Sequence, residues 1–530
     1  MHTKATLTGC RAPFRWLAAA LAFLPLATYS QANIATDAAD TWDGDAIARL
    51  QADMKSGATT SRELVRVFLA RIDAIDKHGP ALNSVIEVNP DALAIATQLD
   101  AERARSGARG PLHGIPILLK DNIDTADRML TTAGSLALVN SRPSQDAFLV
   151  KKLREAGAVI LGKTNLSEWA NFRSTHSTSG WSARGGLTRN PYAVDRNSCG
   201  SSSGSGAAIA AYLAVAAVGS ETDGSIVCPS GINGIVGIKP TVGLISRSGV
   251  IPISASQDTA GPMALSVADA VALLNAMAAP DPKDPASTVA TRPAATDYGQ
   301  FLKADGLRGV RVGVVRSLGG FDARVDKVFD EAVNAMRAQG AEIVDKVELK
   351  TGDKLGDDEL NVLKYEFKDG LNKYLATRTD APKTLAELIA FNEKEPRELE
   401  HFGQEIFTDT EAKGPLTSPE YRQISARAKR AAGRDGIDAA LKKYKVDVLV
   451  SPTVGLAWKT DLVNGDHYTG GNSSQAAAVA GYPHITVPAG FVKGLPVGVS
   501  FIGTAWSEGK LIQYAYAYEQ ATRARRPPKL

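Results

Sequence analysis

Cysteine and histidine are scarce in this chain of 530 residues, which contains three cysteines and seven histidines. Three cysteines are too few for a disulfide scaffold, and no Cys/His cluster has zinc spacing. Charge of one sign is also lacking, because 60 basic residues stand against 57 acidic ones. A chain this close to neutral carries no electrostatic footprint for nucleic acid. No apolar run reaches the length that spans a bilayer. We therefore expect no metal site, no nucleic-acid partner and no stable membrane insertion.

The N-terminus has the parts of a secretory signal peptide. Residues 1–32 contain basic residues and no acidic one, and an apolar stretch runs from Trp16 to Ala27. The small-x-small sequence Ser30-Gln31-Ala32 follows it. This order is typical of a secretory signal, and an amphipathic N-terminal helix is the alternative. We expect cleavage after Ala32 and export, to the periplasm or out of the cell.

Cleavage at that point removes Cys10 and leaves two cysteines, Cys199 and Cys228. In an exported protein two cysteines can pair as a disulfide. Two small buried thiols are an equally good interpretation, because free cysteine behaves as a small apolar residue. The sequence leaves both alternatives open.

Short apolar runs alternate with amphipathic stretches along the chain. Residues 60–63 (Thr-Ser-Arg-Glu) form a capping box, and apolar side chains then recur at helical spacing as far as Lys77. A strand is predicted over 115–119 and a helix over 146–156. The alternation indicates an α/β protein. The stretch from about 275 to about 430 is more charged and helical, and carries fewer diagnostic motifs.

Two motif matches point to other functions. Residues 157–164 fit the phosphate-binding pattern G-x-x-x-x-G-K-T, but their apolar middle favours a strand and a helix precedes them. We predict a turn at Gly157 followed by a core strand. Residues 200–204 fit the G-x-S-x-G nucleophile elbow, yet the preceding residues are loop-like. Nothing selects a partner for that serine among the later histidines, His401, His467 and His484.

Three further stretches together indicate a hydrolytic site. Lys120 ends an apolar run, and a buried lysine loses its proton easily enough to act as a base. Residues 197–206 are rich in serine and glycine and supply hydroxyls on a tightly bending backbone. Residues 219–226 end a small-residue run in a turn ahead of a serine, where consecutive amides can stabilise an oxyanion. Taken singly, each stretch is a weak signal of a hydrolytic site. A lysine at the end of a strand, for example, is usually a surface residue.

Together these motifs resemble the amidase signature family. The likeness is close from about residue 110 to 262 and resumes at the C-terminus, within about 440–530. The resemblance implies an α/β fold in which residues 33–530 form one large catalytic domain. It further implies a central mixed β-sheet covered by α-helices on both faces.

The family's Ser–cisSer–Lys triad maps onto three residues of this chain. Ser225 matches the nucleophile, Ser201 the bridging serine that the family holds in a cis peptide, and Lys120 the base. Ser202 matches a further hydroxyl that supports the triad. The resemblance implies an oxyanion hole made by four backbone amides, those of Thr222, Asp223, Gly224 and Ser225. It implies no metal and no organic cofactor.

The chain departs from the family beside this triad. Many members have Gly-Gly-Ser at the nucleophile, whereas this chain has Asp223-Gly224-Ser225 and so adds a carboxylate. Cys199 and Cys228 flank Ser201 and Ser225. If those serines meet in space, a bridge between the cysteines would brace the site.

Within the family the chain looks most similar to bacterial peptide amidases, which remove the C-terminal carboxamide of peptides. The likeness lies in residues 165–172, 180–186 and 503–508 and in the variant turn before Ser225. It implies that Asn171, Phe172 and Trp181 contact the substrate, although ordinary packing is the alternative for aromatic residues.

The expected partner is a small-molecule or peptide amide, and the expected assembly is a monomer or a weak homo-oligomer. Three other functions stay open. They are a fatty-amide or aryl-amide hydrolase, the glutamine-dependent transamidation subunit, and a catalytically silent binding protein on the same fold.

Overall fold

The structure, a computed structural model, describes residues 44–289, 296–468 and 470–530. The signal peptide predicted over 1–32 lies outside the described residues. Within them, no helix is both long enough and apolar enough to cross a membrane.

A mixed β-sheet of 11 strands forms the centre of the molecule. Strand β2 pairs in parallel with β3 and β8, and β11 with β12 and β13, while the other neighbours are antiparallel. From one edge to the other the strands are β1 (Val85–Val88), β3 (Val159–Thr164), β2 (Pro116–Lys120), β8 (Ala216–Glu221), β10 (Thr259–Ala264), β9 (Val236–Lys239), β14 (His484–Val492), β15 (Leu495–Ile502), β13 (Val448–Pro452), β11 (Arg311–Val314) and β12 (Glu342–Val344). The predicted α/β class and mixed sheet are confirmed.

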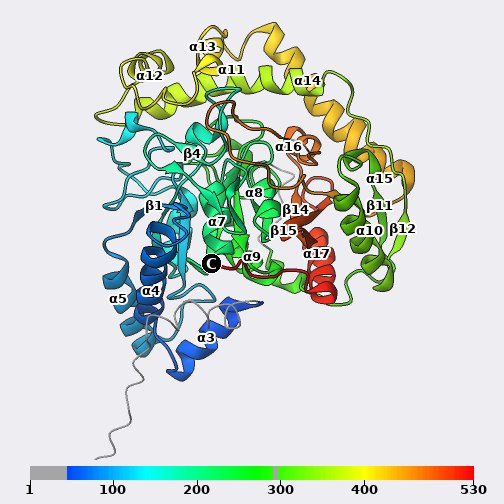
Figure 1. Cartoon of the computed structure of the whole chain (residues 1–530), viewed down its shortest axis with the longest axis horizontal. Helices are drawn as coiled ribbons and strands as arrows, with labels where there is room; N and C mark the ends of the chain where they lie inside the picture. The colour runs from blue at the N-terminus through cyan, green and yellow to red at the C-terminus, as the bar shows by residue number, and fades with distance from the viewer. Residues whose placement is uncertain (1–43, 290–295, 469) are drawn as a thin grey trace, which may run out of the picture.

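Helices flank this sheet. Figure 1 shows α4 and α5 beside β1 at one side, α10 and α15 beside β11 and β12 at the other, and α11 to α14 along the top. The α-helices are α3 (Ala46–Ser56), α4 (Ser61–Arg71), α5 (Ala92–Ser106), α6 (Phe148–Glu155), α7 (Ser203–Ala210), α8 (Val227–Ile232), α9 (Val267–Met277), α10 (Ala323–Ala338), α11 (Leu355–Ala376), α12 (Leu385–Asn392), α13 (Glu405–Glu411), α14 (Pro419–Ala432), α15 (Ala439–Tyr444), α16 (Gln475–Ala480) and α17 (Glu508–Thr522). Two short ribbons, β4 (Trp181–Ser182) with β5 (Gly186–Leu187) and β6 (Arg189–Asn190) with β7 (Ala193–Asn197), lie outside the main sheet.

Helix α4 begins where the capping box predicts. Thr60 is the N-cap, and its side chain accepts a hydrogen bond from the Glu63 amide at 3.1 Å. The other half of the box differs, because the Glu63 carboxylate pairs with Arg66, at 2.7 Å from its Nη2. The periodic stretch then continues past Arg71 as one π-helical segment, Ile72–Lys77.

The stretch that fits the phosphate-binding pattern is a core strand, as predicted. Helix α6 precedes it, Gly157 adopts a left-handed φ of +83°, and residues 159–164 form the fully buried β3. A Cβ at Gly157 would stand 2.9 Å from His113 Nδ1, so the turn requires glycine.

The centre of the sheet places two strand ends side by side. Every residue of β2 and of β8 is buried, and the two strands pair in parallel. Parallel strands end at the same edge of a sheet, which in α/β proteins is where ligands bind. Lys120, the last residue of β2, and Glu221, the last residue of β8, therefore lie at one edge.

Candidate active site

Lys120 is buried beside two serines. Its side chain is fully shielded from solvent. Nζ donates to Ser201 Oγ at 2.7 Å, to Ser220 Oγ at 2.9 Å and to the Ser220 carbonyl at 3.1 Å. Three acceptors fix the amine in direct contact with the Ser201 hydroxyl, as the resemblance implies for a lysine base.

Burial also changes the proton affinity of this amine. Loss of solvation lowers the pKa of Lys120 from its ordinary value of 10.5 to about 7, while Asp258 and Glu221 oppose that shift. A large fraction of the lysine is therefore neutral near pH 7, and a neutral amine can accept a proton.

Ser201 stands at an unusual backbone position. The Gly200–Ser201 peptide bond is cis, as the resemblance implies. A Cβ on Gly200 would stand 2.1 Å from Ser167 Oγ, so a larger residue there would force the Ser167 side chain to move. The Ser201 carbonyl accepts from the Ser167 amide at 3.1 Å.

Ser202 joins the Ser201 segment to the Ser225 segment. Its amide donates to the Ser225 carbonyl at 3.1 Å. Its hydroxyl donates to the Ser220 carbonyl at 3.1 Å and accepts from the Ser220 amide at 3.2 Å. The predicted supporting role of Ser202 thus has a geometric basis, and these contacts involve no histidine.

Ser225 closes a tight turn between β8 and α8. Gly224 takes a φ of +79°, and its carbonyl accepts from the Cys228 amide at 2.8 Å. The structure records no acceptor within the described chain for the amides of Asp223, Gly224 and Ser225. Buried backbone amides are nearly always paired, and Gly224 and Ser225 are buried, so this run of free donors indicates a place for a ligand oxygen.

The three triad residues lie at one edge of the sheet, but the hydrogen bond that would join the two serine hydroxyls is not formed. Among the described residues no hydrogen bond joins the hydroxyls of Ser201 and Ser225. Catalytic hydrogen bonds commonly tighten only when substrate is bound. The roles of the three residues therefore stay predictions that this geometry supports.

The extra carboxylate of this chain, Asp223, faces the C-terminal part of the molecule. It accepts a hydrogen bond from the Ser474 hydroxyl. Burial, with the nearby carboxylate of Glu359 on α11, raises the pKa of Asp223 well above its ordinary value. Glu359 accepts from Gln257 Nε2 at 2.8 Å and from Gln475 Nε2 at 2.9 Å. Sequence reasoning identified none of the last four residues, because each is remote in the chain from Ser225.

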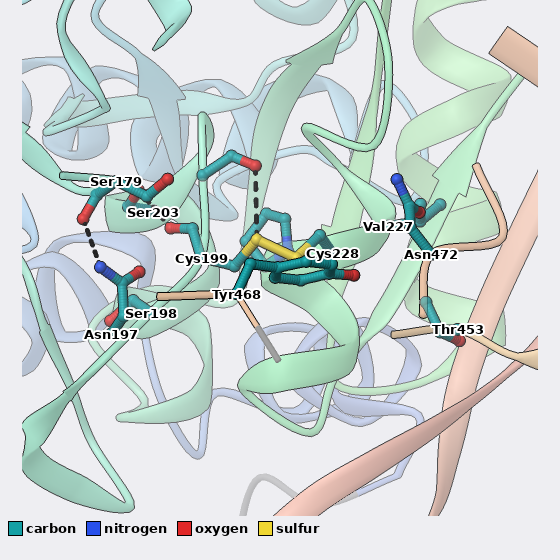
Figure 2. Close-up of a disulfide and its surroundings, with 12 residues drawn as sticks. Ser179, Asn197, Ser198, Cys199, Ser203, Val227, Cys228, Thr453, Tyr468 and Asn472 are labelled. Carbon is teal, nitrogen blue, oxygen red and sulfur yellow. Dashed lines mark hydrogen bonds between the residues drawn. A yellow bond between two sulfur atoms is a disulfide. The ribbon is translucent and has the colours of Figure 1, made fainter. Parts of the chain in front are cut away.

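The two cysteines form a disulfide across the site. Cys199 and Cys228 are bonded, with their Cα atoms 6.0 Å apart. Cys199 lies two residues before Ser201 and Cys228 three residues after Ser225, so the bridge ties the two serine segments together. Figure 2 shows the bridge beside Tyr468, which belongs to the loop after β13. The sequence left a bridge and free thiols open, and the structure has the bridge.

The three predicted substrate contacts occupy different surroundings. Phe172 is 6% exposed and packs edge-on against Phe367, with ring centroids 5.0 Å apart. Trp181 is 4% exposed and packs in the same way against Phe402 at 5.1 Å. Asn171 is half-buried and donates from Nδ2 to Ser179 Oγ at 2.9 Å. Their contact with substrate stays a prediction.

A cavity of about 340 Å³ adjoins the lysine side of the site. Its wall includes Asn122, Ser220 and Thr222, together with Glu366 and Tyr374 of α11. The Ser220 hydroxyl already accepts from Lys120 and, at 2.9 Å, from Asn122 Nδ2. A small molecule in this cavity can therefore contact Ser220, whose hydroxyl is hydrogen-bonded to the Lys120 amine. Across the part of the chain that the structure describes, no group of three or more His, Cys, Asp or Glu side chains could hold a metal ion.

Comparisons with known proteins agree with this geometry. The sequence model of the Amidase family matches residues 63–512. Native peptide amidase from Stenotrophomonas maltophilia is similar in structure, with a TM-score of 0.87 and 53% identity over 91% of this chain and 98% of that one. A peptide amidase in complex with the competitive inhibitor chymostatin gives a TM-score of 0.88, at 53% identity over 91% of this chain and 99% of that one.

Two relatives found by sequence show how broad the likeness is. A probable amidase of Arabidopsis thaliana is 42% identical over 89% of this chain and 88% of its own length. A glutamyl-tRNA(Gln) amidotransferase subunit from Carboxydothermus hydrogenoformans is 35% identical over 90% of this chain and 97% of its own length.

Proposed function

The chain belongs to the amidase family and hydrolyses amide C–N bonds, and on that premise we propose that it removes the C-terminal carboxamide of peptides. The observation that carries the chemistry is the 2.7 Å hydrogen bond from a fully buried lysine amine to Ser201 on its cis peptide. The likeness to two peptide amidase structures, one with a competitive inhibitor bound, supports a peptide amide as substrate.

The proposed reaction begins with proton transfer. The Ser225 hydroxyl is a poor nucleophile until a base takes its proton. Neutral Lys120 draws that proton through the Ser201 hydroxyl, and Ser225 Oγ attacks the carboxamide carbon. The carbonyl oxygen becomes an oxyanion, which the free amides of residues 223–225 stabilise.

The second half reverses the relay. As the C–N bond breaks, the proton passes from Lys120 through Ser201 to the leaving nitrogen, and ammonia departs. The peptide is then an ester on Ser225 Oγ. Water loses a proton to the same relay, attacks that ester, and releases the peptide acid with the proton returned to Ser225. Atoms and protons balance without any further reactant.

Export of the mature chain is part of the proposal. A signal peptide over 1–32 would send the protein to the periplasm or out of the cell, where disulfides persist. The Cys199–Cys228 bridge supports such a compartment. The mass of the protein recovered from the producing cells checks this point: a chain that still begins at Met1 would contradict it.

The bridge and the proposed export also separate this chain from its transamidating relatives. An enzyme that modifies charged tRNA works inside the cell, where thiols are kept reduced. A fatty-amide or aryl-amide hydrolase uses the same chemistry with another acyl pocket, so it differs from the proposal only in substrate.

Mass spectrometry of a substrate pool tests the proposal. The pool contains peptide amides, the same peptides as free acids with internal bonds intact, and simple fatty and aryl amides. We expect only the C-terminal carboxamides to gain the small mass of exchanging NH₂ for OH, and Ser225→Ala to leave them unchanged. Turnover confined to fatty or aryl amides would overturn the peptide assignment.

A further inference from the structure

Glu221 is a buried carboxylate directly ahead of the turn that carries Ser225. It ends β8 and is 1% exposed. Its Oε2 accepts from the amide of Ile226 at 2.7 Å and from the amide of Val227 at 3.0 Å. The Glu221 side chain thus links the end of β8 to the start of α8, across the turn that contains Ser225.

This contact divides the amides of the turn into two groups. The amides of residues 223–225 have no acceptor within the described chain, whereas Glu221 holds the next two, at Ile226 and Val227. The first amides of a helix lack partners within the helix and need one elsewhere. Because Glu221 accepts from the amides of Ile226 and Val227, the start of α8 is fixed. The amides of residues 223–225, which precede it, are therefore held in one orientation.

The charge of Glu221 also acts on two buried amines. Burial lowers the pKa of Lys120 to about 7 and that of Lys239 to about 8, and Glu221 opposes both shifts. Asp258 acts in the same direction on Lys120, as Glu508 and Asp223 do on Lys239. The second oxygen of Glu221, Oε1, has no hydrogen-bond partner among the described residues.

We propose that Glu221 is a positioning residue of this site, which holds the amides of residues 223–225 toward the substrate's carbonyl oxygen and sets the charge beside Lys120. The inference rests on the proposed function, since it takes Ser225 as the nucleophile and Lys120 as the base. It adds a residue that touches neither substrate nor the transferred proton.

Two substitutions separate its two effects. Glu221→Asp shortens the side chain by one methylene, so the carboxylate no longer reaches both amides. We expect kcat to fall on the order of a hundredfold with a smaller change in KM, because displacement of reacting groups by about 1 Å has that effect. Glu221→Gln keeps the length and an oxygen for both amides but removes the charge. We expect its alkaline kcat to stay near wild type and the acid midpoint of kcat to move to lower pH.

Glu508→Gln is the matched control. Glu508 is equally buried and accepts from a backbone amide, that of Thr241, at 2.7 Å. It acts on Lys239 but is not among the charges that act on Lys120. We expect this variant to keep the wild-type pH profile.

Thermal unfolding is followed for every variant, and if Glu221→Asp does not fold, the pH profile of Glu221→Gln decides alone. A wild-type kcat in folded Glu221→Asp, or an unmoved midpoint in Glu221→Gln, would overturn the inference. Wild-type and Ser225→Ala activities are measured in the same assay, so failure of the proposed function is seen separately, as absent wild-type turnover.

Discussion

At the scale of single residues, Lys120 is shielded from solvent at the end of β2 and donates to the hydroxyls of Ser201 and Ser220. Removing its amine leaves Ser201 without the group that takes its proton. We expect Lys120→Ala to lower kcat by about a hundredfold to ten-thousandfold, the range lost with a general base. The fold should survive, because the sheet around it is apolar and a buried amine is costly to desolvate. Ammonia release and thermal unfolding measure the two quantities.

Lys163 offers a matched control one strand away. It is equally buried at β3, but its Nζ donates to the Ile123 carbonyl and to Thr131 Oγ1, both at 2.7 Å, and to no serine. We expect Lys163→Met to keep kcat close to wild type. Retained activity in Lys120→Ala near neutral pH would overturn the assignment of the base.

The pH dependence follows from the same burial. Because Lys120 must be neutral to accept a proton, kcat should rise as the pH passes through about 7. Stability should change with the same sign, since the unfolded lysine keeps its proton up to about 10.5 while the folded one loses it near 7. This residue's contribution to the free energy of unfolding therefore falls as the pH drops from about 10.5 to about 7. Initial rates measured from about pH 6 to 8 test the kcat profile, and urea titrations from about pH 7 to 10.5 test the free energy of unfolding. A kcat that does not change across pH 7 would contradict the role of Lys120 as the base.

At the scale of elements, the Cys199–Cys228 bridge joins the segment before α7 to the first turn of α8. Closing a loop with a sequence separation of 29 residues is worth about 3.5 kcal/mol on the chain-entropy model. We expect the double variant Cys199→Ser/Cys228→Ser to lose about that much stability. We also expect a larger fractional loss of kcat than of substrate affinity, since the bridge aligns the two serine segments.

Reduction of the mature wild-type protein should have the same effect as the double variant. If export removes Cys10, only these two cysteines remain, so a reducing agent acts on this bridge alone. The double variant itself should be insensitive to the reductant. Full activity of the reduced protein, with free thiols verified, would contradict the bracing role.

Elements with local signals were predictable, and elements joined by distant contacts were not. The capping residue Thr60 and the core strand β3 follow from a few neighbouring residues, and both are confirmed. Ser474 was missed because it meets Asp223 across 251 residues, through a loop without regular structure. The sequence could not decide between a disulfide and two free thiols, because the distance between Cys199 and Cys228 depends on how the two turns that carry them are placed in the fold.

At the scale of the whole molecule, the 11-stranded sheet brings remote parts of the chain to one edge. Strands β2 and β8 carry Lys120 and the Ser225 turn, and the loop after β13 returns Ser474 to that turn. Helix α11 adds Glu359 from the charged region that carried fewer diagnostic motifs. The site is therefore a product of the complete fold, which explains why the family likeness covers nearly the whole chain.

The most direct test of the central claim is covalent labelling of the nucleophile. The folded protein is treated with a fluorophosphonate, digested, and mapped by mass spectrometry, beside Lys120→Ala and Ser201→Ala. The relay predicts a single label on Ser225 whose rate rises through pH 7 in the wild type and is strongly reduced in both variants. A label on another serine would contradict the assignment. No label on the folded protein would favour a silent binding role for this fold.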